Sequence, residues 1–210
     1  MPTASRTLSA KSPAIPEHLP GRPALIAVRL SGSEGINSLF EYRLLLKTPD
    51  AVNNRFSLAA RFNLDDFIGR DLTVSIALDD SGSDYPGVGT REISGLISDA
   101  KMLREAGRDV SYELTLRPWL HLATLRTNSK IFQEQTVVEV LEDLLVDYAF
   151  PVEKRLYDFT RYPKRDYQTQ YNETDFAFFS RLCEEWGISY FFEHSDGAHR
   201  LILADANAAF

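Results

Sequence analysis

The segment 170–188 constrains the fold of this chain more than any other, because it carries helix start and stop signals in order. Asn172 suits the N-cap position, and the acidic residues Glu173 and Asp175 follow where the helix dipole favours negative charge. Apolar residues at steps of three and four predict a buried helix face formed by Phe176, Phe179, Cys183 and Trp186. Gly187 suits the left-handed position that ends such a helix.

A second helix is predicted upstream by the sequence Thr136-Val137-Val138-Glu139, which fits a capping box. In a capping box the threonine hydroxyl and the glutamate carboxylate satisfy free amides at the helix start. Apolar residues then follow at helical spacing as far as Tyr148, and Pro151 stops the helix.

Strand patterns occupy most of the remaining chain. The clearest is 71–78, where apolar residues alternate with polar ones and predict a half-buried strand. The other predicted strands are 24–30, 40–46, 91–100 with a bulge at Gly95, 112–116, and a hairpin of 188–194 with 199–204. Between them, 57–64 fits a short helix or an irregular connection, while 79–89 and 105–108 fit loops. This spacing favours a small barrel or sandwich, so the predicted fold class is α+β and mainly β.

The composition is that of a globular protein with a substantial core. Of 210 residues, 44% are hydrophobic and 25% are charged. The net charge of −7 argues against nucleic acid as the main partner, because a duplex binder needs a basic face. Residues 1–22 are rich in proline, serine and alanine, and we expect a disordered arm there. They lack an apolar h-region, which argues against a conventional signal peptide, and no apolar run approaches the length of a membrane span.

Two sequence blocks carry a family resemblance. The first runs from Gln170-Tyr171-Asn172-Glu173-Thr174-Asp175 through Arg181-Leu182 and Trp186-Gly187-Ile188 to Tyr190, Phe192 and His194. The second comprises Leu116-Arg117-Pro118-Trp119-Leu120, Ile131-Phe132-Gln133 and the helix that begins at Thr136. In this order and spacing they resemble the N-terminal hub region of VgrG spike proteins of type VI secretion systems, which is similar to the tail hubs of contractile phages. The resemblance covers roughly 112–205 and is looser before residue 100.

The resemblance implies a structural protein rather than an enzyme. It implies a phage tail-hub-like fold of β-barrel subdomains with two or more packed helices. The first subdomain would span 23–120 and the second 121–210, and the second would continue beyond Phe210. The full-length protein would form a homotrimer that continues an inner tube and contacts baseplate, spike-tip or effector proteins. It would assemble in the bacterial cytoplasm and be secreted by a route that needs no signal peptide. A tail-hub protein of a contractile phage or related injection particle is the alternative.

A hydrolase is a third hypothesis, in which Cys183 or the pair His194 and His199 would be catalytic. Cys183 could be a nucleophile with either histidine, or a small buried apolar residue. The acidic neighbours Glu184 and Glu185 favour the buried role, because a reactive thiolate needs an electropositive setting. Since Cys183 is the sole cysteine, an intramolecular disulfide and a zinc site built on several cysteines are excluded.

A metal site and a pair of catalytic carboxylates are two further hypotheses that the sequence raises. His194 and His199 could bind a metal with Asp196 or Asp205, but the spacing is not diagnostic and favours a structural or surface role. Glu184 and Glu185 point about 100° apart on a helix, so they do not face one glycosidase site. His121 follows Pro-Trp-Leu and fits a packing residue at a strand end. No motif for a cofactor, a metal or a catalytic residue is assigned.

Aromatic side chains are expected in the core or at an interface. The residues singled out are Trp119, Phe132, Phe176, Phe179, Leu182, Trp186, Tyr190 and Phe192. The segment 155–171 also mixes tyrosine with arginine and lysine. Such a segment could stack single-stranded nucleic acid or form a protein interface, and the acidic net charge favours the interface.

Overall fold

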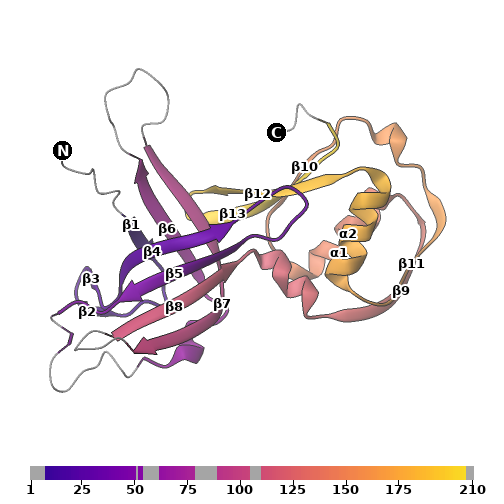
Figure 1. Ribbon diagram of the computed structural model, residues 1–210. Coiled ribbons are helices and arrows are strands. Elements are labelled where there is room, and N and C mark those ends of the chain that lie inside the picture. The colour runs from indigo at the N-terminus through magenta and orange to yellow at the C-terminus, as the bar shows by residue number, and fades with distance from the viewer. Residues whose placement is uncertain (1–7, 51, 54–61, 79–88, 105–109, 207–210) are drawn as a thin grey trace. The chain divides into compact units, whose positions relative to one another are not determined.

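The computed structural model describes residues 8–50, 52–53, 62–78, 89–104 and 110–206 (Figure 1). Residues 1–7 of the expected arm, most of the segment 57–64 and the expected loops 79–89 and 105–108 lie outside this part of the chain, except for residues 62–64 and 89. The chain divides into two compact units. The first unit contains Met1–Ser33, Phe40–Arg117 and His194–His199, and the second contains Glu34–Leu39, Pro118–Glu193 and Arg200–Phe210.

The first unit is built on an antiparallel sheet that curls on itself (Figure 1). Its strands, in spatial order, are β1 (Leu8–Lys11), β6 (Asp71–Leu78), β7 (Gly89–Arg104), β8 (Val110–Arg117), β5 (Glu41–Lys47) and β4 (Ile26–Ser33). The edge strands β1 and β4 lie close to each other. Smaller elements of this unit are β2 (Glu17–Leu19), β3 (Arg22–Pro23) and a 3-10 helix, η2 (Leu64–Asp66).

Alternation along the strands builds the core of this sheet. Tyr42, Leu44 and Leu46 of β5 are buried, and they pair with Leu116, Leu114 and Tyr112 of β8. Residues directly opposite each other share one face of a sheet, so these three pairs form a continuous apolar layer. This layer forms part of the core of the first unit.

The N-terminal segment differs from the expected disordered arm. Residues 8–11 form β1, which pairs antiparallel with β6 from Leu8 opposite Ile76 to Lys11 opposite Thr73. The Ser12 hydroxyl then donates a hydrogen bond to the Asp71 carbonyl at 2.6 Å. A strand of four residues adds to an existing edge through its backbone, so composition gives little sign of it.

The bulge predicted at Gly95 is wrong. Gly95 pairs regularly with Leu72, and the register shift of β7 against β8 lies between Ile97 and Asp99. A Cβ on Gly95 would lie 3.1 Å from the Arg117 carbonyl oxygen and 3.2 Å from the Phe40 ring. Glycine is therefore needed there for close packing rather than for a bulge.

The second unit combines helices with two small sheets (Figure 1). Its helices are η3 (Trp119–Thr124), α1 (Val137–Leu145), η4 (Val146–Tyr148), η5 (Phe159–Arg161) and α2 (Asp175–Trp186). One sheet has the order β10 (Val152–Arg155), β13 (Ala198–Ala204) and β12 (Ser189–Ser195), with β10 parallel to β13. The other is a two-stranded ribbon of β9 (Thr127–Gln135) and β11 (Arg165–Thr174). The tip of the β12–β13 hairpin, His194–His199, belongs to the first unit.

The start signal is confirmed for α1, which ends at Leu145 and is followed by η4 rather than running on to Tyr148. The signals for α2 are partly wrong. Thr136 and Glu139 form the capping box at the start of α1, and Gly187 ends α2 with a φ of 65°. The N-cap of α2 is Thr174, however, and its hydroxyl accepts from the Ala177 amide. Asn172 instead has a φ of 47° where the register of β11 shifts, a left-handed conformation that asparagine tolerates.

The buried face of α2 is also rotated from the predicted one. It consists of Asp175, Phe178, Phe179, Leu182 and Cys183, whereas Phe176 and Trp186 are half-buried. The α+β, mainly β fold class is confirmed by the curled sheet and the packed helices.

Candidate functional site

The Asp175 carboxylate of the second unit is 0% exposed and is bonded by several side chains. One of its oxygens accepts hydrogen bonds from Asn128 Nδ2 at 2.9 Å and Gln170 Nε2 at 2.7 Å. The other accepts from the Tyr148 hydroxyl at 2.7 Å and pairs with Arg126 Nε at 3.1 Å. These partners come from β9, β11, η4 and the turn before β9, so one carboxylate joins four segments at the start of α2.

The electrostatics of this cluster favour the ionised carboxylate. Burial on its own would raise the pKa of Asp175, but hydrogen bonds from Gln170, Asn128 and Tyr148 and the positive charge of Arg126 hold it below its usual value. The same cluster raises the pKa of the Tyr148 hydroxyl, through burial and its bond to Asp175. A carboxylate that is ionised at neutral pH and bonded on both oxygens is suited to stabilising structure.

The sequence predicts Asp175 in the first helical turn but gives no sign of this cluster. The Asp175 amide does donate to the Arg126 carbonyl at 2.9 Å, but the carboxylate is held by side chains that are up to 49 residues away in sequence. Local periodicity carries no signal for such partners.

The aromatic residues singled out from the sequence lie in the second unit. Trp119 is fully buried and stacks on Phe150 with ring centroids 5.2 Å apart. Phe132 is buried and stacks on Phe178 at 5.6 Å, and Tyr190 meets Phe179 edge-on at 5.0 Å. Of the full set, Trp119, Phe132, Phe179, Leu182 and Tyr190 are buried, while Phe176, Trp186 and Phe192 are half-buried.

Cys183 is buried on α2. Burial raises the pKa of its thiol to about 12, so the thiolate that a nucleophile requires is scarce at neutral pH. Glu184 and Glu185 beside it are exposed, and Glu185 forms an ion pair with Arg165 at 2.6 Å.

The histidine pair lies in the first unit at the hairpin tip. His194 Nδ1 accepts a hydrogen bond from the Ser94 amide at 3.0 Å. Both imidazole rings pack against Phe40, at centroid distances of 5.1 Å for His194 and 5.6 Å for His199. His199 is 6% exposed, and burial together with the nearby His194 lowers its pKa to about 4. The buried His199 ring and the hydrogen-bonded His194 ring, both packed on Phe40, fit the structural role.

The acidic residues proposed beside this pair have separate roles. Asp196 is exposed and occupies a left-handed turn position with a φ of 53°. Asp205 belongs to the second unit, where it accepts from the Tyr157 amide at 3.0 Å and the Tyr162 hydroxyl at 3.1 Å. Across the described parts of the chain, no group of three or more His, Cys, Asp or Glu residues could hold a metal ion. None of the helices described is both long and apolar enough to cross a membrane.

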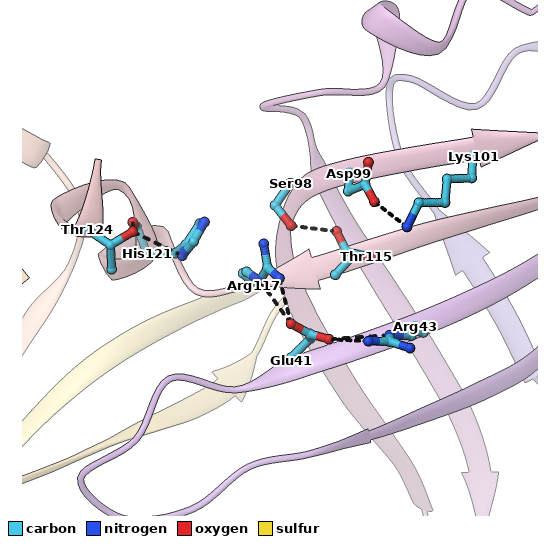
Figure 2. Close-up of polar contacts among 9 residues, drawn as sticks. All are labelled: Glu41, Arg43, Ser98, Asp99, Lys101, Thr115, Arg117, His121 and Thr124. Carbon is cyan, nitrogen blue, oxygen red and sulfur yellow. Dashed lines mark hydrogen bonds and ion pairs between the residues drawn. The ribbon is translucent and has the colours of Figure 1, made fainter. Parts of the chain in front are cut away.

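Figure 2 shows a polar cluster on the curled sheet, formed by the partly exposed side chains of Glu41, Arg43 and Arg117. Glu41 of β5 accepts from Arg117 Nη2 at 2.6 Å and from Arg43 Nη2 at 3.0 Å. Those bonds, from Arg117 first and then Arg43, lower the pKa of Glu41. Figure 2 also shows the ion pair between Lys101 and Asp99, two positions apart on β7. Its Nζ–Oδ2 distance is 2.8 Å.

His121 lies on η3 and not at a strand end (Figure 2). Its carbonyl accepts a hydrogen bond from the Thr124 hydroxyl at 2.7 Å, one turn later. This bond stabilises the short helix.

The fold and these clusters define a class of structural module, in which buried polar groups hold elements together. A curled antiparallel sheet followed by a helical unit is the architecture of tail-hub proteins. The chain belongs to the phage tail baseplate hub (GPD) family, whose model matches residues 33–210.

Curated relatives include spike proteins of type VI secretion. The chain is 32% identical over 194 residues to the type VI secretion system spike protein VgrG1c of Pseudomonas aeruginosa, covering 90% of this chain and 24% of that protein. It is also 32% identical over 191 residues to VgrG1a of the same organism, covering 90% of this chain and 27% of that protein. The chain thus spans about a quarter of the length of these relatives.

Solved structures show the same fold at lower identity. An Escherichia coli component of the type VI secretion system, c3393, described as similar to the T4 phage tail proteins gp27 and gp5, matches with a TM-score of 0.70 and 22% identity. The match covers 96% of this chain and 50% of that one. A 43 kDa prophage tail protein from Shewanella oneidensis matches with a TM-score of 0.57 and 15% identity, over 98% of this chain and 57% of that one.

Proposed function

We propose that this chain is the N-terminal hub module of a type VI secretion spike. The observation that carries the proposal is the extent of the similarity to VgrG1c and VgrG1a, which reaches 90% of the chain and therefore spans both units. A shared motif confined to segment 170–194 would support much less. The task of the module is mechanical: it forms the base on which a spike stands.

In the full-length protein, three copies form a ring that continues the inner tube and carries the spike, with baseplate, spike-tip or effector proteins as partners. The names of the relatives support delivery as the purpose of the assembly. One of them, the actin cross-linking toxin VgrG1 of Vibrio cholerae, is 42% identical over 101 residues, which cover 46% of this chain and 9% of the toxin. Assembly takes place in the bacterial cytoplasm, and export follows without a signal peptide.

The chemistry of the candidate residues supports a module without catalysis. The Cys183 thiol is protonated at neutral pH because burial raises its pKa to about 12. His194 Nδ1 is occupied by the Ser94 amide, and the Asp175 carboxylate is occupied by four side chains. Each group stabilises its own unit.

The second candidate function is that of a tail hub in a contractile phage or a related injection particle. The observation that favours it is the likeness to the prophage tail protein from Shewanella oneidensis, which extends over 98% of this chain. The fold is common to both kinds of machine, so particle composition separates them.

The experiment uses the full product of the natural gene carrying an epitope tag in its own bacterium. We expect the protein in the culture medium of the wild type and its retention in a strain without the contractile sheath, while a cytosolic marker enzyme stays inside in both. Light scattering should give three times the mass of the single full-length chain. Release that does not depend on the sheath would contradict the secretion role, and recovery in DNA-containing particles would favour the phage role.

A further inference from the structure

The tip of the β12–β13 hairpin is held on the curled sheet by three hydrogen bonds. The Ser94 amide donates to His194 Nδ1 at 3.0 Å, and the Gly197 amide donates to Glu92 Oε2 at 3.0 Å. The Thr73 hydroxyl donates to the Gly197 carbonyl, also at 3.0 Å. All of these residues belong to the first unit, so the tip is an integral part of that unit.

The bond to His194 exists only while that imidazole is neutral. A backbone amide donates and cannot accept, so His194 Nδ1 presents its lone pair to Ser94 and the ring carries its proton on Nε2. A second proton would have to enter at Nδ1, where two N–H groups would then face each other. Ser94 is 2% exposed and lies beyond the end of β8, which pairs with β7 from Leu96 onward. Protonation of His194 therefore removes the acceptor of a buried amide.

His199 adds a second titratable ring to the tip. It is 6% exposed, and both imidazoles pack against Phe40, which is 0% exposed. The centroids of the His194 and His199 rings are 6.1 Å apart. Burial first, and then the nearby His194, lowers the pKa of His199 to about 4. The docked tip therefore resists the uptake of a proton by His199.

Charged groups on the neighbouring strands act on the same site. Glu92 of β7 accepts from the Gly197 amide, and the strand register places Asp71 of β6 and Lys11 of β1 on the face that carries Thr73. Carboxylates on this face attract an imidazolium, but that attraction does not replace the acceptor that the Ser94 amide loses. The other charged residues next to these contacts in sequence are Arg91, Glu41 with its partner Arg117, and Glu193, Asp196 and Arg200 of the hairpin itself.

We propose that this tip, His194–His199, is a pH-dependent latch, which is docked on the curled sheet while His194 and His199 are neutral and leaves it when both are protonated. In the released tip both imidazoles are in water, where the pKa of histidine is about 6.5. At pH 5 each released histidine therefore shifts the equilibrium towards release by roughly 30-fold, and the two together by about 10³-fold. The inference goes beyond the structural role of the module, because it makes the first unit responsive to acid.

The test is footprinting of phenylalanine with hydroxyl radicals on the full product of the natural gene at pH 7.5 and pH 5. Phe40 is the reporter, because both imidazoles of the tip pack against it. Phe67 is the matched control, since it is 1% exposed and lies in the same unit. We expect modification of Phe40 to rise at least tenfold at pH 5 while that of Phe67 changes less than twofold, and a return to pH 7.5 should reverse the change.

Two outcomes would overturn the latch. Equal modification of Phe40 at the two pH values would mean that the tip stays docked in acid. A rise of Phe40 and Phe67 together would mean that acid unfolds the whole unit rather than releasing its tip. Neither outcome bears on the proposed function, which is tested by sheath-dependent release.

A double variant supplies an independent measurement. When His194→Asn is combined with His199→Phe, the asparagine oxygen can accept from the Ser94 amide without titrating, and a phenyl ring fills the buried site. Phe40 should then stay protected at pH 5. His18→Asn, at a half-exposed histidine of the same unit, should keep the rise seen in the wild type. A rise in the double variant as large as that in the wild type would contradict the proposal.

Discussion

The two units differ in how deeply their principal polar clusters are buried. In the first unit the apolar residues of β5 and β8 fill the interior, and the Glu41–Arg117 pair remains about a third exposed, at 36% and 31%. In the second unit a carboxylate with no exposed surface, Asp175, lies where α2 begins. The first unit is held by a continuous backbone ladder, whereas the second has small sheets and relies on a buried polar cluster to join its pieces.

The comparison shows how an exposed ion pair and a buried carboxylate differ in their effect on a fold. An exposed ion pair contributes little because water competes for both charges. A buried carboxylate is costly to form, yet it specifies its surroundings, since every partner must be present for the charge to be tolerated. The second unit should therefore fail sharply when one member is removed, and the first should tolerate the loss of its surface pair.

The largest effect is expected from Asp175→Ala. The change leaves Arg126, Tyr148, Gln170 and Asn128 without their common acceptor and should lower the free energy of unfolding by about 3–5 kcal/mol. Urea titration followed by circular dichroism would measure it. Asp147→Ala, which removes an exposed partner of Arg126, is the matched control and should cost about 1 kcal/mol or less. Equal losses for the two variants would mean that the buried carboxylate matters no more to the second unit than an exposed one.

Apolar packing in the second unit is tested by a pair of tryptophan substitutions. Trp119→Ala should cost about 3–5 kcal/mol because the ring is fully buried and stacked on Phe150. Trp186 is half-buried and contacts the Arg165 guanidinium, so Trp186→Ala should cost less than half as much. Thermal melts of both variants provide the comparison, and a larger loss at Trp186 would contradict it.

The units should also respond to acid in different ranges. The pKa of His199 is lowered from about 6.5 to about 4, so the unfolded chain takes up this proton first and stability falls as the pH drops from about 6.5 towards 4. The loss is worth roughly 3 kcal/mol at the lower end. The pKa of Asp175 lies below its usual value, so its contribution is complete above pH ~4 and is lost only in stronger acid.

His199→Phe should flatten the dependence of unfolding free energy on pH between about 6.5 and 4. His18→Asn, a change at a half-exposed histidine, serves as the control and should leave the slope intact. Urea titrations at half-unit pH steps would measure this slope in both variants and in the wild type. A slope unchanged in His199→Phe would mean that other groups control the acid response.

The smallest effect is expected from Glu41→Gln on the curled sheet. With Glu41 and Arg117 both about a third exposed, the loss should be about 0–1 kcal/mol and should shrink further in 1 M salt. Denaturation at low and high salt would measure it. A cost of several kcal/mol would show that the first unit also depends on a polar cluster.

The features that the sequence predicts correctly are local ones. The capping box at Thr136 and Glu139, the glycine that ends α2 and the hairpin around Asp196 and Gly197 depend on residues within one or two turns of each other. The curled sheet followed from strand spacing. These signals act over short separations, where sequence and geometry are directly related.

The remaining features depend on distant partners. Thr174 replaces Asn172 as the N-cap because β11 continues through the shifted register and delays the helix. The role of Asp175 needs Arg126, 49 residues earlier, and β1 needs the edge of β6. Tertiary contacts of this kind override local propensity.

The hairpin tip His194–His199 has a consequence for the order of events during protein synthesis. The first unit includes this tip, which lies in sequence between two segments of the second unit, and the Ser94–His194 hydrogen bond spans 100 positions of sequence. A nascent chain that has emerged only as far as Arg117 therefore holds the whole curled sheet but lacks six residues of its unit. Completion must wait until about eighty more residues have been translated, so the first and second units reach their final state almost together, late in translation.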